Sequence, residues 1–316
     1  MNKLFAYNSH RIRILIRVFF ISFLLSSTFF VGINIFQKNL ENFFYAQIGK
    51  PFEEISLVKV PKKENLELNA KSAISLRINK NGKEKIIFEK NPNEILPIAS
   101  LTKLMTALIV LEDPESYQFS KIVTISKEAA SQEDVPEGGN LKFGEKVSVK
   151  KLLDLMLIHS SNDAAFALAE EIGINNFVER MNRKAKILGI LNTHFVNPTG
   201  LDPESLHYLK EAKSYFNYST ANDLVKLAKY ILNEFPLIYE ISIGKPYYQI
   251  KNGFSDLVLN FYLIGGKTGY TDEAGGCMIL VLENEKGTRF INLILGTKNA
   301  QDRIEEMQKI INFIKK

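Results

Sequence analysis

The chain has 316 residues, of which 46% are hydrophobic and 24% charged, and it contains 18 glycines, 10 prolines and one cysteine. This is the composition of an ordinary globular protein, and it excludes collagen, low-complexity disorder and a disulfide-stapled miniprotein. Lysines and arginines number 40 against 35 aspartates and glutamates, but residues 1–40 contain five of the basic residues and no acidic one. The rest of the chain is therefore balanced in charge, which gives no support to a nucleic-acid-binding surface.

A charge-free apolar segment, residues 18–37, follows a short basic tail, residues 1–17. Its length matches the roughly 20 helical residues that cross a bilayer core. Arg11, Arg13 and Arg17 precede it, so the positive-inside rule places the N-terminus in the cytoplasm and the remaining chain outside. A cleaved signal peptide is the alternative, although the apolar run is long for one and no A-x-A-like site follows. We expect an uncleaved single-pass anchor that holds the protein in the lipid bilayer of the plasma membrane.

Residues 38–68, with two prolines and clustered charges, predict a linker, and residues 69–316 predict one domain with a substantial core. Periodicity and turn residues predict a β-hairpin around Asn81-Gly82, then helices, then late strands and a terminal helix. The expected strands are 72–78, 85–89, 278–283 and 290–295, and the expected helices are 100–111, 149–158, 163–172, 177–188 and 300–314. Strands at both ends with helices between them predict one sheet built from distant segments, an α/β or α+β layer fold.

The sequence argues against several classes of hydrolase. The four histidines are His10, His159, His194 and His207, and no H-E-x-x-H or H-x-H pair occurs, which disfavours a zinc hydrolase. The single cysteine, Cys277, cannot form a multi-cysteine metal site. No G-x-S-x-G elbow is present, which argues against an α/β-hydrolase. We expect neither a metal nor an organic cofactor, and a serine hydrolase here would need a base other than histidine.

Ser100 and Lys103 form a serine–lysine pair. The pattern S-x-x-K occurs four times, but here it leads straight into an apolar helical stretch, residues 104–108. Ser100 would then lie at a helix N-terminus, where free backbone N–H groups favour developing negative charge. Lys103 follows one turn later on the same face, so its amine can reach the Ser100 hydroxyl. A simple N-cap role for Ser100 is the structural alternative.

A second polar motif, His159-Ser160-Ser161-Asn162-Asp163, lies between two apolar helical stretches. As a loop it would present a hydroxyl from Ser160 and an amide from Asn162. Ser160 and Asp163 also have the spacing of a capping box, so a structural role is the alternative.

A third motif, Lys267-Thr268-Gly269, is the one K-T-G of the sequence and follows Gly265-Gly266. The small residues would let a substrate backbone lie close to the chain. Lys267 would supply a fixed positive charge and Thr268 a hydroxyl for a carboxylate. A glycine-rich turn at a strand end is the structural alternative.

These three motifs occur once in the order that is the signature of serine β-lactamases and penicillin-binding proteins. From about Ser72 onward the chain resembles the D-alanyl-D-alanine carboxypeptidases, the low-molecular-mass penicillin-binding proteins of peptidase family S11. Further matching segments are 177–182, 197–201, 218–221 and 267–277. The resemblance implies a serine β-lactamase/transpeptidase-like α+β fold, with an antiparallel sheet flanked by helices, a helical subdomain, and the active site at their junction.

The resemblance also implies a membrane-anchored serine carboxypeptidase that removes the terminal D-alanine from peptidoglycan stem peptides, with β-lactam antibiotics as covalent inhibitors. Ser100 would attack the carbonyl of the penultimate D-alanine and form an acyl-enzyme. Lys103, kept neutral by burial and by the Lys267 charge, would be the general base. Ser160 would relay a proton to the departing amine, and Asn162 would hold Lys103 and the substrate amide.

The third motif would bind the substrate in the same interpretation. Lys267 and Thr268 would bind the terminal carboxylate or polarise the Ser160 hydroxyl. Gly269 would admit the substrate backbone. The backbone N–H of Tyr270, with that of the nucleophile, would form the oxyanion hole.

Arg289, at the start of a late strand, is a second candidate for the substrate carboxylate, with an ordinary surface salt bridge as the alternative. The sequence departs from the family pattern in three respects, one of which is the long stretch Lys213-Ser214-Tyr215-Phe216 before Asn217. Many relatives carry a C-terminal β-rich domain and a C-terminal amphipathic anchor, which we do not expect here, since the N-terminal span would replace that anchor. Asn217 precedes Tyr218 where many relatives have histidine, and we assign it no catalytic role.

Three other functions are compatible with parts of this pattern. A peptidoglycan DD-endopeptidase would use the same chemistry on cross-links. A serine β-lactamase shares the fold, but a class A enzyme would carry a Glu-x-x-x-Asn loop between the second and third motifs, and we find no convincing one. A catalytically dead, tethered binding protein is disfavoured because the motif residues are intact.

Overall fold

The computed structural model describes residues 66–132, 140–202, 216–244 and 254–315. The described residues belong to one compact unit, Leu66–Lys316. The expected basic tail and membrane anchor, residues 1–17 and 18–37, lie outside the described residues. Within the described ranges, no helix is long and apolar enough to cross a membrane.

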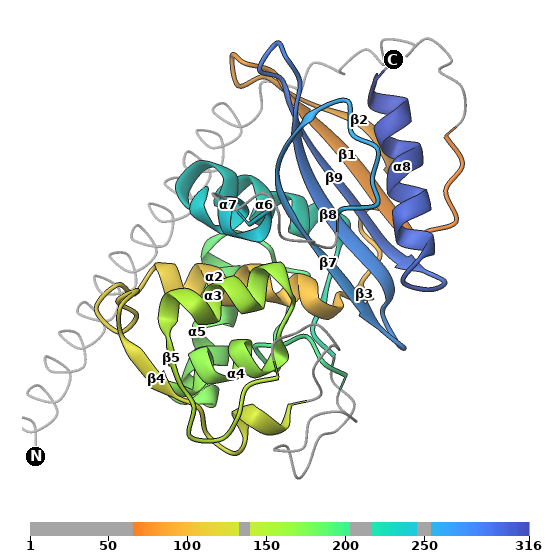
Figure 1. Ribbon diagram of the computed structural model, residues 1–316. Helices are drawn as coiled ribbons and strands as arrows, with labels where there is room; N and C mark the ends of the chain where they lie inside the picture. The colour runs from red at the N-terminus through yellow and green to blue at the C-terminus, as the bar shows by residue number, and fades with distance from the viewer. Residues whose placement is uncertain (1–65, 133–139, 203–215, 245–253, 316) are drawn as a thin grey trace, which may run out of the picture. The chain divides into compact units, whose positions relative to one another are not determined.

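A five-stranded antiparallel sheet forms the framework, with the strand order β2-β1-β9-β8-β7 (Figure 1). Its strands are β1 (Ser72–Ile78), β2 (Glu84–Lys90), β7 (Tyr262–Thr271), β8 (Gly275–Glu283) and β9 (Arg289–Thr297). β1 pairs with β9 from Ser72 opposite Leu295 to Ile78 opposite Arg289. The sheet therefore joins early and late segments of the chain, as the order of the predicted elements indicates, and the predicted hairpin and late strands are confirmed.

Helices cover both faces of the sheet (Figure 1). The helix α8 (Asp302–Lys315) contacts β8 and β9 on one face, and α6 (Ala221–Glu234) and α7 (Leu237–Ser242) contact the sheet on the other. Successive residues of β9 illustrate the two faces, because Leu293 belongs to the core beneath α6 and Ile294 to the core beneath α8. A strand buried on both faces has a nearly continuous apolar run instead of a strict alternation.

A helical subdomain is inserted between β2 and β7. Its helices are α2 (Thr102–Leu111), α3 (Val149–Ile158), α4 (Asn162–Glu170) and α5 (Ile174–Ile187). Two short strand pairs accompany them, β3 (Leu96–Pro97) with β6 (Tyr218–Ser219) and β4 (Ile122–Thr124) with β5 (Lys146–Ser148). The four helices predicted in this region are confirmed, α3 with the predicted ends and the other three with shifted ends, while α6 and α7 are additional. The result is the expected α+β arrangement of a sheet and a helical subdomain.

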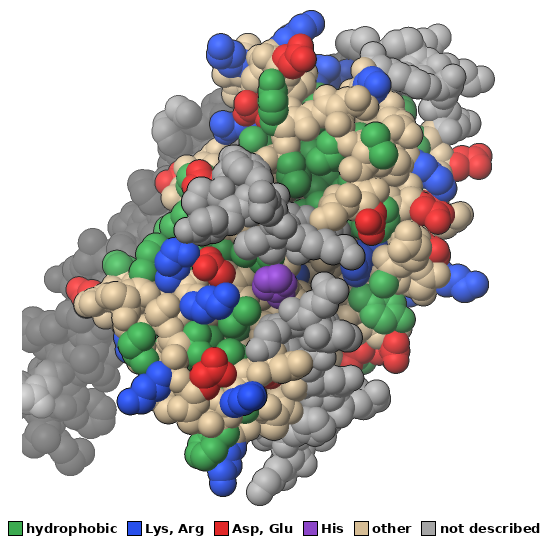
Figure 2. Space-filling model, viewed as in Figure 1, with side chains coloured by type: hydrophobic (Ala, Val, Ile, Leu, Met, Phe, Trp, Pro, Cys, Tyr) green, Lys and Arg blue, Asp and Glu red, His purple; other side chains and the backbone are tan. Residues whose placement is uncertain are grey.

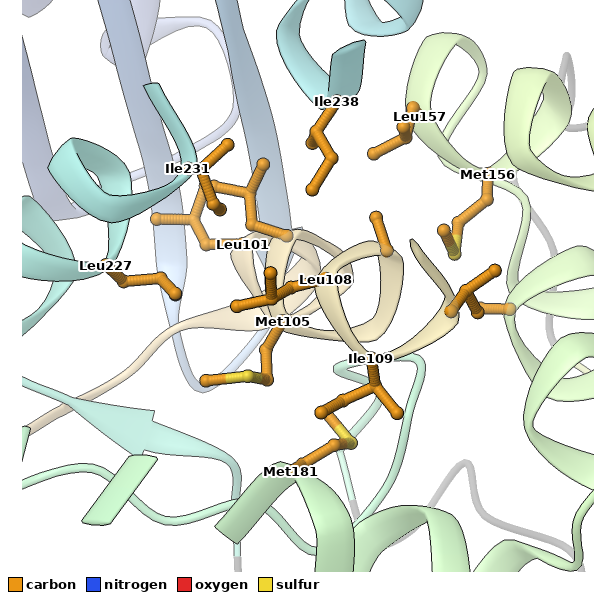
Figure 3. Packing of buried hydrophobic residues seen from close by; sticks show 14 of the residues in the cluster. Leu101, Met105, Leu108, Ile109, Met156, Leu157, Met181, Leu227, Ile231 and Ile238 are labelled. Carbon is orange, nitrogen blue, oxygen red and sulfur yellow. The ribbon is translucent and has the colours of Figure 1, made fainter. Parts of the chain in front are cut away.

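The helix α2 runs through the middle of the core (Figure 3). Every residue from Thr102 to Val110 is buried, and the sequence TKLMTALIVL is accordingly apolar around most of its circumference. Figure 3 shows its side chains surrounded by Met156 of α3, Met181 of α5, Leu227 of α6 and Ile238 of α7. Each such side chain contributes about 1.5–3 kcal/mol through burial. The segment that carries Ser100 and Lys103 is thus fixed by a helix that is buried along most of its length.

Charged side chains are spread over the surface. On the described part of the face seen in Figure 2, lysines and arginines are interspersed with aspartates and glutamates. Ion pairs such as Arg180–Asp113 and Lys121–Glu171 join oppositely charged groups of different elements. This distribution agrees with the charge balance of the sequence.

Candidate active site

Ser100 lies in a single turn of 3-10 helix, Ala99–Leu101, that leads into α2. The backbone of Ala99 has a φ of 45°, a left-handed conformation that costs free energy for a non-glycine residue. Two glycines approach this turn. A Cβ on Gly269 would lie 2.9 Å from the Ser100 nitrogen, and one on Gly200 would collide with the Ala99 carbonyl. No side chain caps α2, so the N-cap interpretation of this serine is wrong.

The amine of Lys103 is fully buried and contacts three acceptors. Its Nζ lies 3.0 Å from Ser100 Oγ, 2.6 Å from Asn162 Oδ1 and 2.7 Å from the Thr199 carbonyl oxygen. The one-turn spacing of Ser100 and Lys103 predicts the first contact. The third was missed, because a backbone acceptor has no side-chain signature in the sequence.

The two serines of the second motif have different roles. The Ser161 side chain caps α4 by accepting a hydrogen bond from the Ala164 backbone N–H at 3.1 Å. Ser160, with a φ of 64°, turns its hydroxyl toward the site, where Ser160 Oγ accepts a hydrogen bond from Lys267 Nζ at 2.8 Å. The capping interpretation thus holds for Ser161 instead of Ser160. Asn162 follows at the first position of α4 and contacts Lys103.

Lys267 lies on β7 with its side chain almost fully buried. Its amine donates to Ser160 Oγ and to the Thr268 carbonyl oxygen, each at 2.8 Å. Burial lowers the pKa of Lys267 well below its ordinary value, and the positive charges of Lys103 and Arg303 lower it further. A positive charge on Lys103 therefore favours loss of the proton from Lys267.

β7 is an edge strand of the sheet. An edge strand presents backbone N–H and C=O groups along one side, to which an extended peptide can add. Next to Lys267, Thr268 is partly exposed, Gly269 is buried against the nucleophile turn, and Tyr270 is 43% exposed. The Tyr270 hydroxyl donates to Asp272 Oδ1 at 3.2 Å. The third motif is therefore part of a continuous strand, not an isolated turn.

Arg289 is not brought to the site. It lies opposite Glu283, which in turn lies opposite Tyr262 at the far end of β7 from Tyr270. Arg289 Nε donates to Glu283 Oε2 at 2.9 Å, and the side chain is 44% exposed. The surface salt bridge is therefore the correct interpretation, because the strand register carries this arginine away from Lys267.

A different arginine, Arg303, lies next to the third motif. It belongs to the first turn of α8, and its Nη1 donates to the Gly269 carbonyl oxygen at 2.8 Å. Burial lowers its pKa, and its Nε has no hydrogen-bond partner within the described residues. Sequence reasoning missed it because the terminal helix carries no motif. A lone arginine in the first turn of an otherwise amphipathic helix was the available signal.

The assembled groups suit acyl transfer. A serine hydroxyl touches a buried amine, and a second hydroxyl touches a second buried amine, at the meeting point of α2, α4 and β7. A nucleophile beside a base, with a separate proton donor nearby, is the arrangement that covalent catalysis requires.

Comparison with known proteins gives consistent matches. A family model described as D-alanyl-D-alanine carboxypeptidase matches residues 58–299. D-alanyl-D-alanine carboxypeptidase DacF of Bacillus subtilis is 35% identical over 248 residues, which cover 72% of this chain and 58% of the relative. A D-alanyl-D-alanine endopeptidase of Escherichia coli is 34% identical over 227 residues, which cover 68% of this chain and 67% of the relative. The chain thus spans less than two thirds of the length of DacF.

Solved structures show the same architecture. Penicillin-binding protein D2 of Listeria monocytogenes, in its ampicillin-bound form, is 30% identical with a TM-score of 0.63 over 80% of this chain and 99% of that chain. PBP3 of Streptococcus pneumoniae is 29% identical with a TM-score of 0.68 over 79% of this chain and 77% of that chain. These likenesses confirm the expected fold.

Proposed function

The chain belongs to the D-alanyl-D-alanine carboxypeptidase family, peptidase family S11, and we propose that it is a serine carboxypeptidase that removes the terminal D-alanine from peptidoglycan stem peptides. One observation carries this proposal: the buried Lys103 amine lies 3.0 Å from the Ser100 hydroxyl and is held there by Asn162 and Thr199. A lysine amine so placed can take the proton of the nucleophile.

Acylation begins at Ser100. Its Oγ attacks the carbonyl carbon of the penultimate D-alanine, and its proton passes to the Lys103 amine. The backbone N–H groups of Ser100 and Tyr270 stabilise the oxyanion that forms. This geometry is supported by the close approach of Gly269 to the Ser100 nitrogen, which brings the next residue of β7 beside the nucleophile.

The departing amine needs a proton, and Ser160 is placed to supply it. Because Ser160 Oγ accepts a hydrogen bond from Lys267, its own hydrogen is free to point at the scissile nitrogen. Ser160 then recovers a proton from Lys267. Protonation of Lys103 in the first step favours this transfer, because the Lys103 charge lowers the pKa of Lys267.

Hydrolysis of the acyl-enzyme runs the transfers in reverse. Water attacks the ester carbonyl and gives its proton through Ser160 to Lys267. Lys103 returns its proton to Ser100 as the ester bond breaks. Both lysines and both serines then have their starting protonation states, which agrees with a covalent two-step reaction.

The anionic end of the substrate would lie along β7. Lys267 and Arg303 place two positive charges on or next to this strand, and Thr268 adds a partly exposed hydroxyl. A carboxylate close to two buried cations is favoured because each interaction is stronger in a low-dielectric site. We therefore assign to Arg303 the carboxylate-binding role for which the sequence suggested Arg289.

Release of D-alanine from a peptide ending in D-Ala-D-Ala tests the proposal. The full chain in detergent should release D-alanine, and Ser100→Ala should lower the rate at least a thousandfold with an unchanged circular dichroism spectrum. Undiminished release by the folded variant would contradict the assignment of the nucleophile.

Endopeptidase activity is a second candidate, favoured by the match to endopeptidase relatives. It uses the same acylation on a different substrate, so a cross-linked peptide dimer assayed beside the linear peptide separates the two. A β-lactamase would instead consume penicillin rapidly without releasing D-alanine. A tethered binding protein would do neither.

Membrane anchoring is a separate part of the proposal, with the catalytic domain outside the plasma membrane. It is supported by the charge-free residues 18–37 after a basic tail. We expect the full chain to resist alkaline extraction from membranes and to lose that resistance in the double variant Leu24→Lys, Phe29→Lys. A mature N-terminus beyond residue 37 would indicate a cleaved signal peptide instead.

A further inference from the structure

Asn217 is buried, 3% exposed, where three segments of the chain meet. Its Oδ1 accepts hydrogen bonds from the backbone N–H groups of Val196, at 2.7 Å, and Asn197, at 3.2 Å. Its Nδ2 donates to the Asn197 carbonyl oxygen and to Thr102 Oγ1, both at 2.9 Å. Because backbone N–H groups can only donate, these contacts fix which way the amide points. Asn217 thus ties the residue next to Lys103 to the loop that starts at Val196.

The same loop is closed from within by Asn197. Its Oδ1 accepts hydrogen bonds from the backbone N–H groups of Thr199, at 3.1 Å, and Gly200, at 2.6 Å. Thr106 Oγ1 of α2 also holds this loop, because it donates to the Pro198 carbonyl oxygen at 2.7 Å. The Thr199 carbonyl, which accepts from Lys103, therefore has little freedom to turn.

The direction of that carbonyl matters for a lysine that acts as a base. A neutral amine has two N–H donors and one lone pair, and the oxygens that Lys103 Nζ contacts include those of Ser100, Asn162 and Thr199. If Asn162 Oδ1 and the Thr199 carbonyl oxygen take the two N–H groups, the lone pair faces Ser100 Oγ. Without a fixed Thr199 carbonyl, the amine can rotate and donate to Ser100, and in that orientation it cannot accept the proton of the serine.

We propose that Asn217 is a positioning residue for the reaction, acting through the Thr199 carbonyl to aim the lone pair of Lys103 at Ser100. Asn217 touches neither substrate nor the reacting atoms in this role. The inference rests on the proposed function, since it concerns the step in which the Ser100 proton moves to Lys103.

The test compares two buried asparagines. Asn292 on β9 is also fully buried, accepts a hydrogen bond from Ser75 Oγ at 2.6 Å and donates to the Leu280 carbonyl oxygen at 3.4 Å. Asn217→Ala and Asn292→Ala should both lower Tm, because each leaves buried partners unpaired. The measured quantities are the rate constant of acylation by benzylpenicillin and the dissociation constant of the complex before acylation, well below both melting temperatures.

Asn217→Ala should slow acylation at least tenfold and leave that dissociation constant within threefold, whereas Asn292→Ala should change both by less than threefold. Equal effects of the two variants would overturn the inference. Absence of acylation in the parent protein would instead refute the proposed function, and the inference with it.

Thr106→Val provides an independent variant if Asn217→Ala does not fold. It keeps the side-chain shape and removes the donor that holds the Pro198 carbonyl. It should slow acylation at least threefold. With Asn217→Ala its effect should be less than multiplicative, because both act on one loop. A folded Thr106→Val protein with the parent acylation rate would contradict the inference.

Discussion

Lys267 Nζ lies 2.8 Å from Ser160 Oγ, although the two residues are 107 positions apart. The contact connects the edge strand of the sheet to the helical subdomain. It also gives Ser160 a hydrogen-bond donor, so that the serine hydrogen is left for another acceptor. Each lysine of the site therefore contacts one serine hydroxyl: Lys103 contacts Ser100, and Lys267 contacts Ser160.

The buried charge of Lys267 should cost stability. Lys267→Met keeps the length of the side chain and removes the charge, so we expect Tm at pH 7 to rise by about 3 °C or more. D-alanine release should fall at least a hundredfold. The exposed Lys146→Met is the control, with Tm within about 1 °C of the parent.

The Tm difference between Lys267→Met and the parent protein should change with pH in a definite direction. The pKa of Lys267 is lower in the folded chain than in the unfolded chain, so the unfolded chain binds more protons between those two values. Stability therefore rises with pH across that window, up to the unfolded-state value near 10.5. The Tm advantage of Lys267→Met should shrink as pH rises from 7 toward 10. A constant difference over this range would contradict the assigned cause.

Neighbouring serines should separate stability from catalysis. Ser161→Ala removes the cap of α4 and should cost about 1 kcal/mol of unfolding free energy, with D-alanine release reduced less than tenfold. Ser160→Ala takes one hydrogen-bond acceptor from the buried Lys267 amine and should lower release at least a hundredfold. Thermal unfolding and D-alanine release of the two variants test this prediction. A larger loss of release in Ser161→Ala than in Ser160→Ala would contradict it.

Gly200 should be irreplaceable for two reasons. Its φ is 87°, and a Cβ there would collide with the Ala99 carbonyl beside the nucleophile. Gly82 has a similar φ of 79° in open space, so Gly82→Ala shows the backbone cost alone, about 1 kcal/mol. Gly200→Ala should cost about 3 kcal/mol or more and slow acylation at least tenfold. Equal losses in the two variants would mean that the nucleophile turn tolerates displacement.

The two arginines considered for the carboxylate should behave differently. Arg303→Gln should lower kcat/KM for D-alanine release at least tenfold, because it removes a buried charge beside Gly269. Arg289→Gln breaks an exposed ion pair and should change kcat/KM less than twofold. A larger effect of the Arg289 substitution would place the substrate at the other end of β7.

Local patterns predicted much of this structure. The hairpin around Asn81-Gly82 follows from turn chemistry, and the contact of Ser100 with Lys103 follows from one turn of helix. The strand β7 was harder, because three glycines and a lysine lack the β-branched alternation of a strand. β7 is a strand because it pairs with β8, and its own residues do not indicate that pairing.

Features that depend on three-dimensional geometry could not be predicted from the sequence. Which serine of the second motif caps α4 depends on backbone angles, since Ser160 and Ser161 are alike in type. The Thr199 carbonyl has no side-chain pattern at all. The choice between Arg289 and Arg303 is decided by strand register and by the first turn of α8, which neither residue reveals alone.

The position of a benzylpenicillin adduct tests the central claim most directly. After brief exposure of the full chain to benzylpenicillin, mass spectrometry of the digested protein should locate the penicilloyl group on Ser100. The adduct should vanish in Ser100→Ala and form slowly in Lys103→Met. An adduct on Ser160 or another residue, or none in a folded protein, would contradict the account.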